Sequence, residues 1–336
     1  MAGKLSSIWM VRTGASAFAV GMVLTQGTPP VYAQAVSSSS GIPYPVKPVR
    51  MVTTLPGGGN DFAARLLAQA LAAPLGQPVF VENRPSGVVV VDTVAKAPPD
   101  GYTILVYSDG LWLLPLMQKV PYDPVRDFAP ITHLGGTPQV LAVHPSLPVK
   151  SVRELVALAK ARPGELNFGA SDPSSASNLS GELFKFMAGV NMVAIRYKAA
   201  GPLVLGVLSG EVQLIFSTAP SVAAHLKSGR LRGLAVTSAQ PSVVVPGLPT
   251  LSASGVPGFE AGTSYGIFVP SKTAPAIVSQ LHREIVRLLN SPEIRERLLS
   301  VGIEVVASSP EQMANLVASE MSRMGKVIRN AGIRFE

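Results

Sequence analysis

The stretch TTLPGGGNDFAARLL, Thr53 to Leu67, joins the end of an apolar run to an amphipathic helical pattern through three consecutive glycines. The run VRMVTTL (49–55) has the character of a β-strand, and the residues after the glycines place apolar side chains on one helical face. A glycine triplet is costly to order, so we expect it where backbone dihedrals are unusual or where a partner approaches closely. The stretch therefore predicts a strand, a glycine-rich loop and a helix in direct succession.

Strand-like and helix-like segments alternate along most of the sequence. PVFVENR (78–84) and YTILVYS (102–108) read as strands, and the second is apolar enough for a sheet buried on both faces. In the second half, SVRELVALAKARPG begins with Ser151 and Glu154 in capping-box spacing, and prolines mark three further helix starts. The alternation predicts an α/β protein with mostly parallel sheets that carry helices on both faces.

Residues 1–35 differ in character from the rest. Lys4 and Arg12 precede an uncharged stretch, and VYAQA then offers small residues at cleavage spacing, so we predict a signal peptide cleaved near Ala33 or Ala35. The apolar run is shorter than the roughly 20 residues that a membrane-spanning helix needs. The chain also has no cysteine, which excludes disulfides, thiolate metal sites and a lipidated cysteine anchor. We therefore expect an untethered protein in the periplasm of a two-membrane bacterium.

Composition and charge exclude several classes of function. With 336 residues and 47% hydrophobic residues, the chain is long enough for two domains with their own cores. The formal charge of +8 is spread along the chain, without the basic runs or basic stripe with interleaved aromatics of a nucleic-acid-binding protein. The four histidines lack metal-ligand spacing, and no Gly-x-Ser-x-Gly elbow occurs. We expect no metal, no cofactor and no catalytic residues.

The loop Pro56 to Asp61 is the first candidate binding site. In an open parallel sheet, ligands bind at the carboxyl ends of strands, where loops lead into helices. The first turn of a helix has N–H groups without partners inside the helix, and glycines let an anion reach them, here at Gly58, Gly59 and Asn60. Taken alone, the stretch fits equally well a tight turn with positive φ, in which Asn60 or Asp61 caps the helix.

A second loop, GASDPSSASNLSGELF (169–184), repeats this arrangement. The strand-like LNF (166–168) leads into a run rich in serine and glycine, and then into a helix with Leu183 and Phe186 on its apolar side. Hydroxyl groups and exposed amides at a helix start suit an anion or the polar groups of a small solute. A plain cluster of helix caps is the alternative reading.

Several phrases in one order carry a resemblance to a known family. They include YPVKPVRMVTTLPGGGNDFAARLLAQAL, LGQPVFVENRP, PPDGYTIL, PYDPVRDFAPIT, HPSLPVKSVRELVALAKARPGELNFGAS and GLPTLSASGVPGFEAGTSYGIFVPSKTAP. From Tyr44 to the C-terminus, the chain resembles the Bug family of extracytoplasmic solute receptors, which serve tripartite tricarboxylate transporters.

The resemblance implies a two-domain periplasmic binding protein of type II, the Venus flytrap fold, with its ligand in the cleft. Domain 1 would comprise residues 43–145 and 264–336, and domain 2 residues 146–263. It also implies that both loops bind carboxylates, largely through backbone amides. The candidate ligand-binding residues are Pro56, Gly57, Gly58, Gly59, Asn60, Asp61, Ser171, Ser174, Ser175, Ser177, Asn178 and Ser217.

This chain departs from the family pattern at places that touch the cleft. After ENRP the family usually continues with Gly-Ala-Gly-Gly, whereas this chain has SGVVVVDTV (86–94). Asn178-Leu179 replaces the usual His-Leu, Ser217 replaces an aspartate, and Ser264 replaces a tryptophan. These changes indicate that the ligand could differ from a typical dicarboxylate.

The sequence therefore predicts a periplasmic receptor that captures a small carboxylated metabolite and delivers it to the membrane components of a tripartite tricarboxylate transporter. We expect a monomer that is not an enzyme and does not bind nucleic acid. Two other readings stay open at this point. The closed receptor could signal to a membrane kinase without transport, or the same α/β layout could belong to a secreted enzyme.

Overall fold

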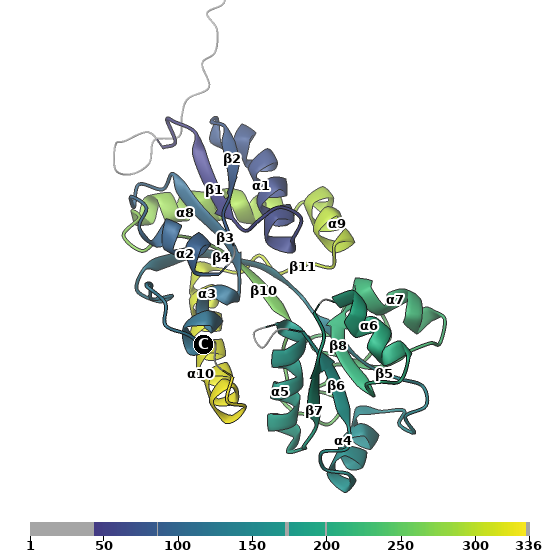
Figure 1. The fold of residues 1–336 in the computed structure, drawn as a ribbon. Helices are drawn as coiled ribbons and strands as arrows, with labels where there is room; N and C mark the ends of the chain where they lie inside the picture. Colours follow the sequence, from purple (N-terminus) through teal and green to yellow (C-terminus); the bar gives the residue numbers. More distant parts are fainter. Residues whose placement is uncertain (1–43, 86, 172–174, 199, 334–336) are drawn as a thin grey trace, which may run out of the picture. The chain divides into compact units, whose positions relative to one another are not determined.

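The strands of this protein form two β-sheets, and helices pack against both of them (Figure 1). The computed structural model describes residues 44–85, 87–171, 175–198 and 200–333. The predicted signal peptide, residues 1–35, and the candidate site residue Ser174 lie outside the described residues.

The first sheet joins strands from both ends of the chain. Its spatial order is β11 (Glu304–Val305), β4 (Phe128–Thr137), β10 (Thr263–Pro270), β3 (Thr103–Ser108), β1 (Val49–Thr53) and β2 (Val79–Asn83). Strand β1 pairs in parallel with β2 and β3, while β10 runs antiparallel to both β3 and β4. The carboxyl ends of β1, β2 and β3 therefore meet at one edge, where the loop at 54–58 begins.

The second sheet is built from the middle of the chain. Its order is β7 (Val193–Arg196), β6 (Asn167–Ala170), β8 (Leu214–Thr218), β5 (Gln139–Val143) and β9 (Arg232–Val236). Strand β6 pairs in parallel with β7 and β8, and β5 runs antiparallel to β8 and β9. Each sheet is thus mixed. Antiparallel pairs are formed by β10 in the first sheet and by β5 in the second.

Helices cover both faces of the first sheet (Figure 1). Met51 and Ile104 pack toward α1 (Gly59–Leu75), α8 (Pro275–Leu289) and α9 (Pro292–Ser300). Their neighbours Val52 and Leu105 pack toward α2 (Val88–Ala95), α3 (Gly110–Leu113) and α10 (Pro310–Asn330), with the 3₁₀ turn η1 (Leu114–Leu116) after α3. This alternation follows from the two-residue period of a strand.

The second sheet is covered in the same way. Helices α4 (Val152–Ala161) and α5 (Ala176–Ala188) bury one face, with Leu141 and Phe168 in that cluster. Helices α6 (Ala200–Leu208) and α7 (Ala219–Lys227) bury the other face, with Val140 and Ile215. The α/β fold class with helices on both faces is therefore confirmed, but the sheets are mixed where mostly parallel sheets were predicted, because β4, β5 and β10 run antiparallel to their neighbours.

The chain changes sheets at Pro138, which alone separates β4 from β5. It returns between β9 and β10, because β10 pairs with β3 and β4. The predicted range 43–145 for domain 1 includes β5, yet β5 pairs with β8 and β9 of the second sheet. The bounds of the two domains stay a prediction. In the structure, the chain first passes from one sheet to the other at Pro138 and not near residue 145.

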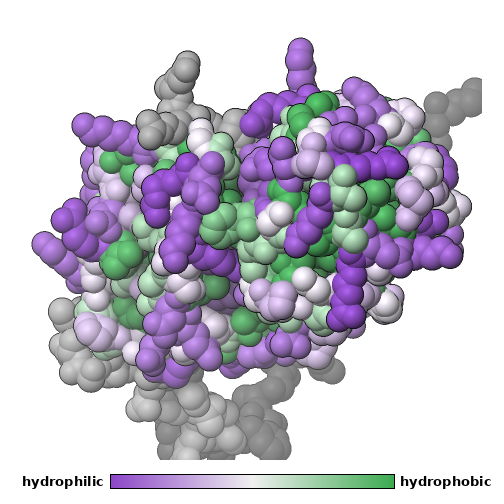
Figure 2. Space-filling model, turned by 90° about the horizontal axis from the view of Figure 1, so that it is seen from below, coloured by the Kyte–Doolittle hydropathy of each residue, from purple (hydrophilic) through white to green (hydrophobic). Residues whose placement is uncertain are grey.

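The face of the molecule drawn in Figure 2 mixes hydrophilic and hydrophobic side chains. On the face in Figure 2, hydrophilic side chains interrupt the hydrophobic ones over most of the area. Individual apolar side chains are nevertheless exposed, such as Leu205 and Val243, as is common on protein surfaces. None of the helices in the described residues is both long and apolar enough to cross a membrane.

Two helical glycines give a matched test of the packing. A β-carbon at Gly181 of α5 would lie 2.6 Å from Cδ2 and 2.7 Å from Cζ of the buried Phe168 ring, whereas one at Gly201 of α6 would meet nothing within 4 Å. We expect Gly181→Ala to lower the free energy of unfolding by about 1–3 kcal/mol through overpacking. Gly201→Ala, at the second residue of α6, should leave it unchanged or raise it slightly, because the methyl group meets nothing and Ala suits a helix at least as well as Gly. Urea unfolding measures both, and equal effects of the two substitutions would contradict the packing.

Candidate functional site

The three glycines of the first loop each have a different role. Gly57 adopts φ +98°, a conformation that favours glycine. Gly58 is the N-cap of α1 in an extended conformation, and a β-carbon there would meet nothing within 4 Å. A β-carbon on Gly59 would overlap the hydroxyl of Tyr265. Gly57 thus takes the turn conformation, but the helix cap is Gly58 and not Asn60 or Asp61. The group that approaches Gly59 is a side chain of the protein itself, and the approach of an anion to this loop stays a prediction.

The start of α1 presents free backbone donors. In the described part of the chain, the N–H groups of Gly58, Gly59 and Asn60 have no hydrogen-bond acceptor. Gly58 caps the helix without a side-chain hydrogen bond, and the Asn60 side-chain oxygen is buried without a partner among those residues. The helix dipole adds positive potential at this end. The arrangement can therefore accept an anion through backbone N–H groups.

Asp61 holds the loop in shape. Its carboxylate is buried and accepts hydrogen bonds from the Arg65 guanidinium (2.9 Å), the Asn83 amide (2.7 Å) and the Gly57 N–H (3.2 Å). Burial opposes ionisation, but these hydrogen bonds outweigh it and keep the pKa of Asp61 below its usual value. Asn83 also donates to the Thr54 carbonyl at 2.5 Å, so β2 is tied to the loop. The structure places Asp61 beneath the loop, as a support for the exposed residues Pro56, Gly57 and Gly58.

In the second loop, more of the backbone N–H groups have hydrogen-bond acceptors within the protein than in the first loop. Ser175 caps α5 by accepting from the Asn178 N–H at 3.3 Å, and the Ser177 hydroxyl lies 3.2 Å from the Ser171 N–H, which donates to it. With the Gln139 amide oriented to satisfy its neighbours, its oxygen accepts from the Ser177 N–H at 3.2 Å. Because these amides already have acceptors, the first turn of α5 offers an anion fewer donors than the first turn of α1.

Ser217 lies beside this loop. It is buried on β8, and the parallel register of β6 with β8 pairs Gly169 with Ile215. Extending that register by two residues sets Ser217 next to Ser171, at the end of β6. The structure thus brings Ser171, Ser175, Ser177 and Ser217 to one edge of the second sheet.

The two loops line different cavities in the described residues. Gly57, Gly58 and Asp61 line a cavity of about 260 Å³ together with Arg65 and Arg297. The first turn of α5 instead lines a small cavity with Asp109, Glu260 and Glu320, through residues Ala176, Leu179 and Ser180. The charged residues of the first cavity are thus two arginines and one aspartate, and those of the cavity beside α5 are three carboxyl groups and one arginine, Arg323.

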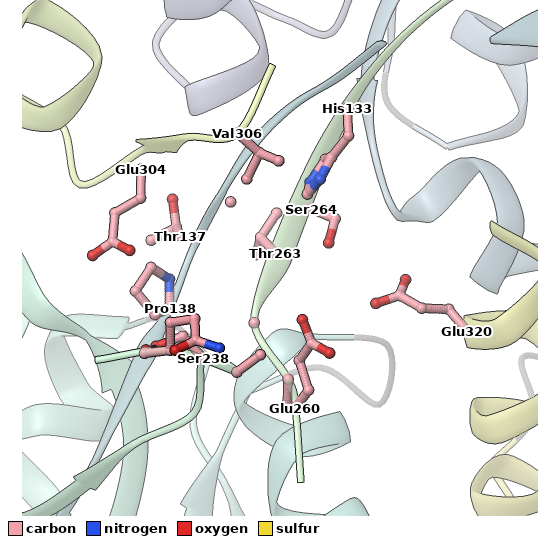
Figure 3. Close-up of a pocket in the computed structure, with 15 residues that line it drawn as sticks. His133, Thr137, Pro138, Ser238, Glu260, Thr263, Ser264, Glu304, Val306 and Glu320 are labelled. Atoms are coloured by element: carbon pink, nitrogen blue, oxygen red, sulfur yellow. Dashed lines mark hydrogen bonds between the residues drawn. The ribbon is translucent and has the colours of Figure 1, made fainter. Parts of the chain in front are cut away.

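A further cavity of about 200 Å³ lies where the chain crosses between the sheets (Figure 3). The side chains of Glu260, Glu304 and Glu320 extend toward it, and His133 lies on its wall. Burial lowers the pKa of His133 to about 4, so its ring is neutral at pH 7. No group of three or more His, Asp or Glu side chains in the described ranges could hold a metal ion.

Asp109 and Glu320 are neighbouring, partly buried carboxyl groups. Burial, and then the Glu320 carboxylate, raise the pKa of Asp109 to about 8. Burial also raises the pKa of Glu320, which accepts a hydrogen bond from the Trp112 indole at 2.7 Å. Ser264, at the position of the family's tryptophan, donates its backbone N–H to Asp109 at 3.4 Å and accepts from the Asp109 N–H at 2.8 Å. The short turn after β3 is thereby fastened to β10.

The valine run also takes a defined place. It begins helix α2 after Gly87, with Val90 and Val91 buried in the core, while Ser86 lies outside the described residues. The Gly87 N–H donates to the Tyr107 hydroxyl at 3.1 Å. The bulk of these two valines therefore faces the sheet.

Sequence reasoning missed several residues of this site. Arg65 lies four residues after Asp61, a spacing typical of helical ion pairs, so its role could have been read from the pattern. Asn83, Gln139 and Tyr265 reach the loops from other strands, and no local spacing links them to the glycines. Their roles depend on strand order.

Comparisons with known proteins point in one direction. Residues 63–333 match the family model described as "Tripartite tricarboxylate transporter family receptor". The chain is 36% identical over 299 residues to Protein BugT of Bordetella pertussis. The aligned region covers 87% of this chain and 92% of that protein.

Two solved structures extend the comparison. "R. palustris Rpa4515 with adipate" is 35% identical with a TM-score of 0.69, covering 87% of this chain and 99% of that chain. MatC (Rpa3494) from Rhodopseudomonas palustris with bound malate is 28% identical with a TM-score of 0.66, covering 85% of this chain and 100% of that one. Adipate and malate are both dicarboxylates.

The raised pKa of Asp109 predicts an unusual contribution to the pH dependence of stability. This pKa is about 8 in the folded protein and about 4 in an unfolded chain, so between these values only the folded state holds the proton. The Asp109 contribution to the free energy of unfolding should therefore fall as pH rises from about 4 to 8, by at most about 1.4 kcal/mol per pH unit. Thermal unfolding from pH 5 to 8 should show a smaller slope for Asp109→Asn than for the wild type.

The matched control is Asp100→Asn, because the Asp100 carboxylate is exposed and pairs with Lys47 at the surface. This variant should keep the wild-type slope. An Asp109→Asn variant whose stability falls with pH as steeply as the wild type would show that Asp109 is ionised at neutral pH.

Proposed function

Because this chain belongs to the family of tripartite tricarboxylate transporter receptors, we propose that it captures a small carboxylate-bearing metabolite at the start of helix α1. The supporting observation is the set of free N–H groups at Gly58, Gly59 and Asn60. A carboxylate placed there would receive several backbone hydrogen bonds and the favourable end of the helix dipole. The adipate and malate named for the two solved neighbours belong to the same chemical class.

The surroundings of the loop favour one carboxylate at this position. Arg65 and Arg297 line the neighbouring cavity, and because Arg65 is paired with Asp61, the net positive charge that attracts anions comes from Arg297. Asp61 adds a negative charge, but Arg65 and Asn83 already neutralise and occupy its oxygens. The loop at 171–178 would contact the remainder of the ligand through serine hydroxyls, because most of its first-turn amides have internal partners.

Binding, in this proposal, is the whole task of the protein. The family and the solved neighbours are solute-binding proteins, and the proposed site holds its ligand through backbone donors that have no acid–base chemistry. The bound metabolite would pass unchanged to the membrane components of the transporter. Members of the family are periplasmic receptors, and we propose that residues 1–35 direct the export of this chain.

A ligand screen tests the proposed class. The protein without residues 1–35 is heated with mono-, di- and tricarboxylates, amino acids and aromatic acids, with adipate and malate in the panel. A bound ligand raises the melting temperature, because its contribution to stability grows as RT ln(1 + [L]/Kd). We expect at least one carboxylate to stabilise the protein and to be recovered unchanged. Stabilisation by neutral sugars or cations alone would contradict the proposal, and turnover of the ligand would indicate an enzyme.

Substitutions of Gly58 separate helix capping from ligand binding. The position tolerates a side chain, since a β-carbon there meets nothing within 4 Å and the backbone is extended. Asp is a better N-cap than Gly by a few tenths of a kcal/mol, so Gly58→Asp should keep or raise the melting temperature. Its carboxylate would occupy the free N–H groups and repel an anionic ligand, and we expect at least a tenfold larger Kd by titration calorimetry.

Gly58→Asn is the matched control for charge. Asn caps a helix about as well as Asp but carries no charge. Its effect on the Kd for a carboxylate should therefore be smaller than that of Gly58→Asp. If both variants bind carboxylates as tightly as the wild type, the anion does not bind at the start of α1.

A further inference from the structure

Tyr265 lies at the meeting point of the first loop and the crossing strands. It belongs to β10, where it pairs with Ser108 of β3 on one side and with Gly135 of β4 on the other. Its side chain is 9% exposed and packs in the core cluster shared with α1. Strand pairing on both sides thus fixes the backbone that carries this ring.

The hydroxyl of Tyr265 lies against the backbone of Gly59. A β-carbon built on Gly59 would overlap that hydroxyl and would lie 3.0 Å from Cζ and 3.1 Å from Cε1 of the ring. Gly59 shows no positive φ, so its backbone conformation is open to other residues. The close approach of Tyr265 is therefore the reason that the structure gives for glycine at this position.

The phenol is a proton donor at this place. Burial raises the pKa of Tyr265 most, a hydrogen bond from the Thr137 side chain to the phenol oxygen lowers it, and Asp109 raises it when ionised. The hydroxyl thus stays protonated at neutral pH and can donate one hydrogen bond. It lies beside Gly59, whose N–H is one of the free donors at the start of α1.

We propose that the Tyr265 hydroxyl is a ligand-binding group, which donates a hydrogen bond to the same carboxylate that the N–H groups at the start of α1 receive. This inference rests on the proposed function, because it takes a carboxylate at that position as given. Gly59 then has two tasks, since its missing side chain exposes its own N–H and lets the phenol stand beside it. Recognition would combine backbone donors from α1 with a side-chain donor from β10.

The test is the substitution Tyr265→Phe, which removes the hydroxyl and keeps the ring in the core. Titration calorimetry with the carboxylate that gives the largest shift in the screen should show a Kd about 10- to 100-fold larger, the range for losing a hydrogen bond to a charged group. For a ligand in which a neutral amide replaces that carboxylate, Tyr265→Phe should raise the Kd by a smaller factor than it does for the carboxylate. A Tyr265→Phe protein with the wild-type Kd would overturn the inference.

Tyr122→Phe is the matched control. Tyr122 is also buried next to the first sheet, in the cluster opposite α1, and its hydroxyl has no hydrogen-bond partner in the described part of the protein. This variant should bind the carboxylate as tightly as the wild type. Equal weakening by both substitutions would assign the effect of Tyr265→Phe to general loosening of the core, and would overturn the inference.

Gly59→Ala adds a second, independent readout. Its methyl group overlaps the hydroxyl in the wild type, and removing that hydroxyl relieves the overlap in part. We therefore expect Gly59→Ala to raise the Kd more in the wild type than in the Tyr265→Phe protein. Strictly additive effects of the two substitutions would show that the hydroxyl does not act at Gly59.

The outcomes also separate this inference from the function on which it rests. A wild-type protein that binds carboxylates and is weakened by Gly58→Asp, but not by Tyr265→Phe, supports the site and overturns the role of Tyr265. A wild-type protein that binds none of the carboxylates in the panel contradicts both.

Discussion

The constraint on which the proposed site depends is the set of backbone N–H groups at the start of α1 that have no acceptor among the described residues. A helix leaves such donors at its first turn, and a side-chain cap commonly satisfies some of them. Here the N-cap is Gly58, which makes no side-chain hydrogen bond, and the Asp61 carboxylate bonds to Gly57, Arg65 and Asn83. These hydrogen bonds tie the loop to α1 and β2 and leave the N–H groups of Gly58, Gly59 and Asn60 available.

The order of the strands brings the rest of the site to this loop. Because β10 returns to the first sheet between β3 and β4, it carries Tyr265 to Gly59 and Ser264 to Asp109. The same crossing region gathers Glu260, Glu304 and Glu320 around a separate cavity. The charges around the two candidate loops therefore differ. The cavity at α1 has two arginines and one aspartate, and the cavity beside α5 has three carboxyl groups and one arginine.

Membership in a receptor family and the local geometry support the same class of ligand by independent routes. The family match covers residues 63–333, and the solved neighbours carry adipate and malate. The geometry shows which of the two loops has donors to spare. At α5, Ser175 and Gln139 already accept from the first turn, so α1 has more free donors to offer an anion.

The sequence by itself determined the alternation of strands and helices, the helix that follows PGGGND, and the family. These features depend on local periodicity, on capping residues and on phrases that are contiguous in the chain. The roles of Asn83, Gln139 and Tyr265, and the crossing at Pro138, were decided by tertiary structure alone. The physical reason is that each acts on a residue of another strand or helix, and strand order, which hydrogen bonding between distant segments sets, has no local signature in the sequence.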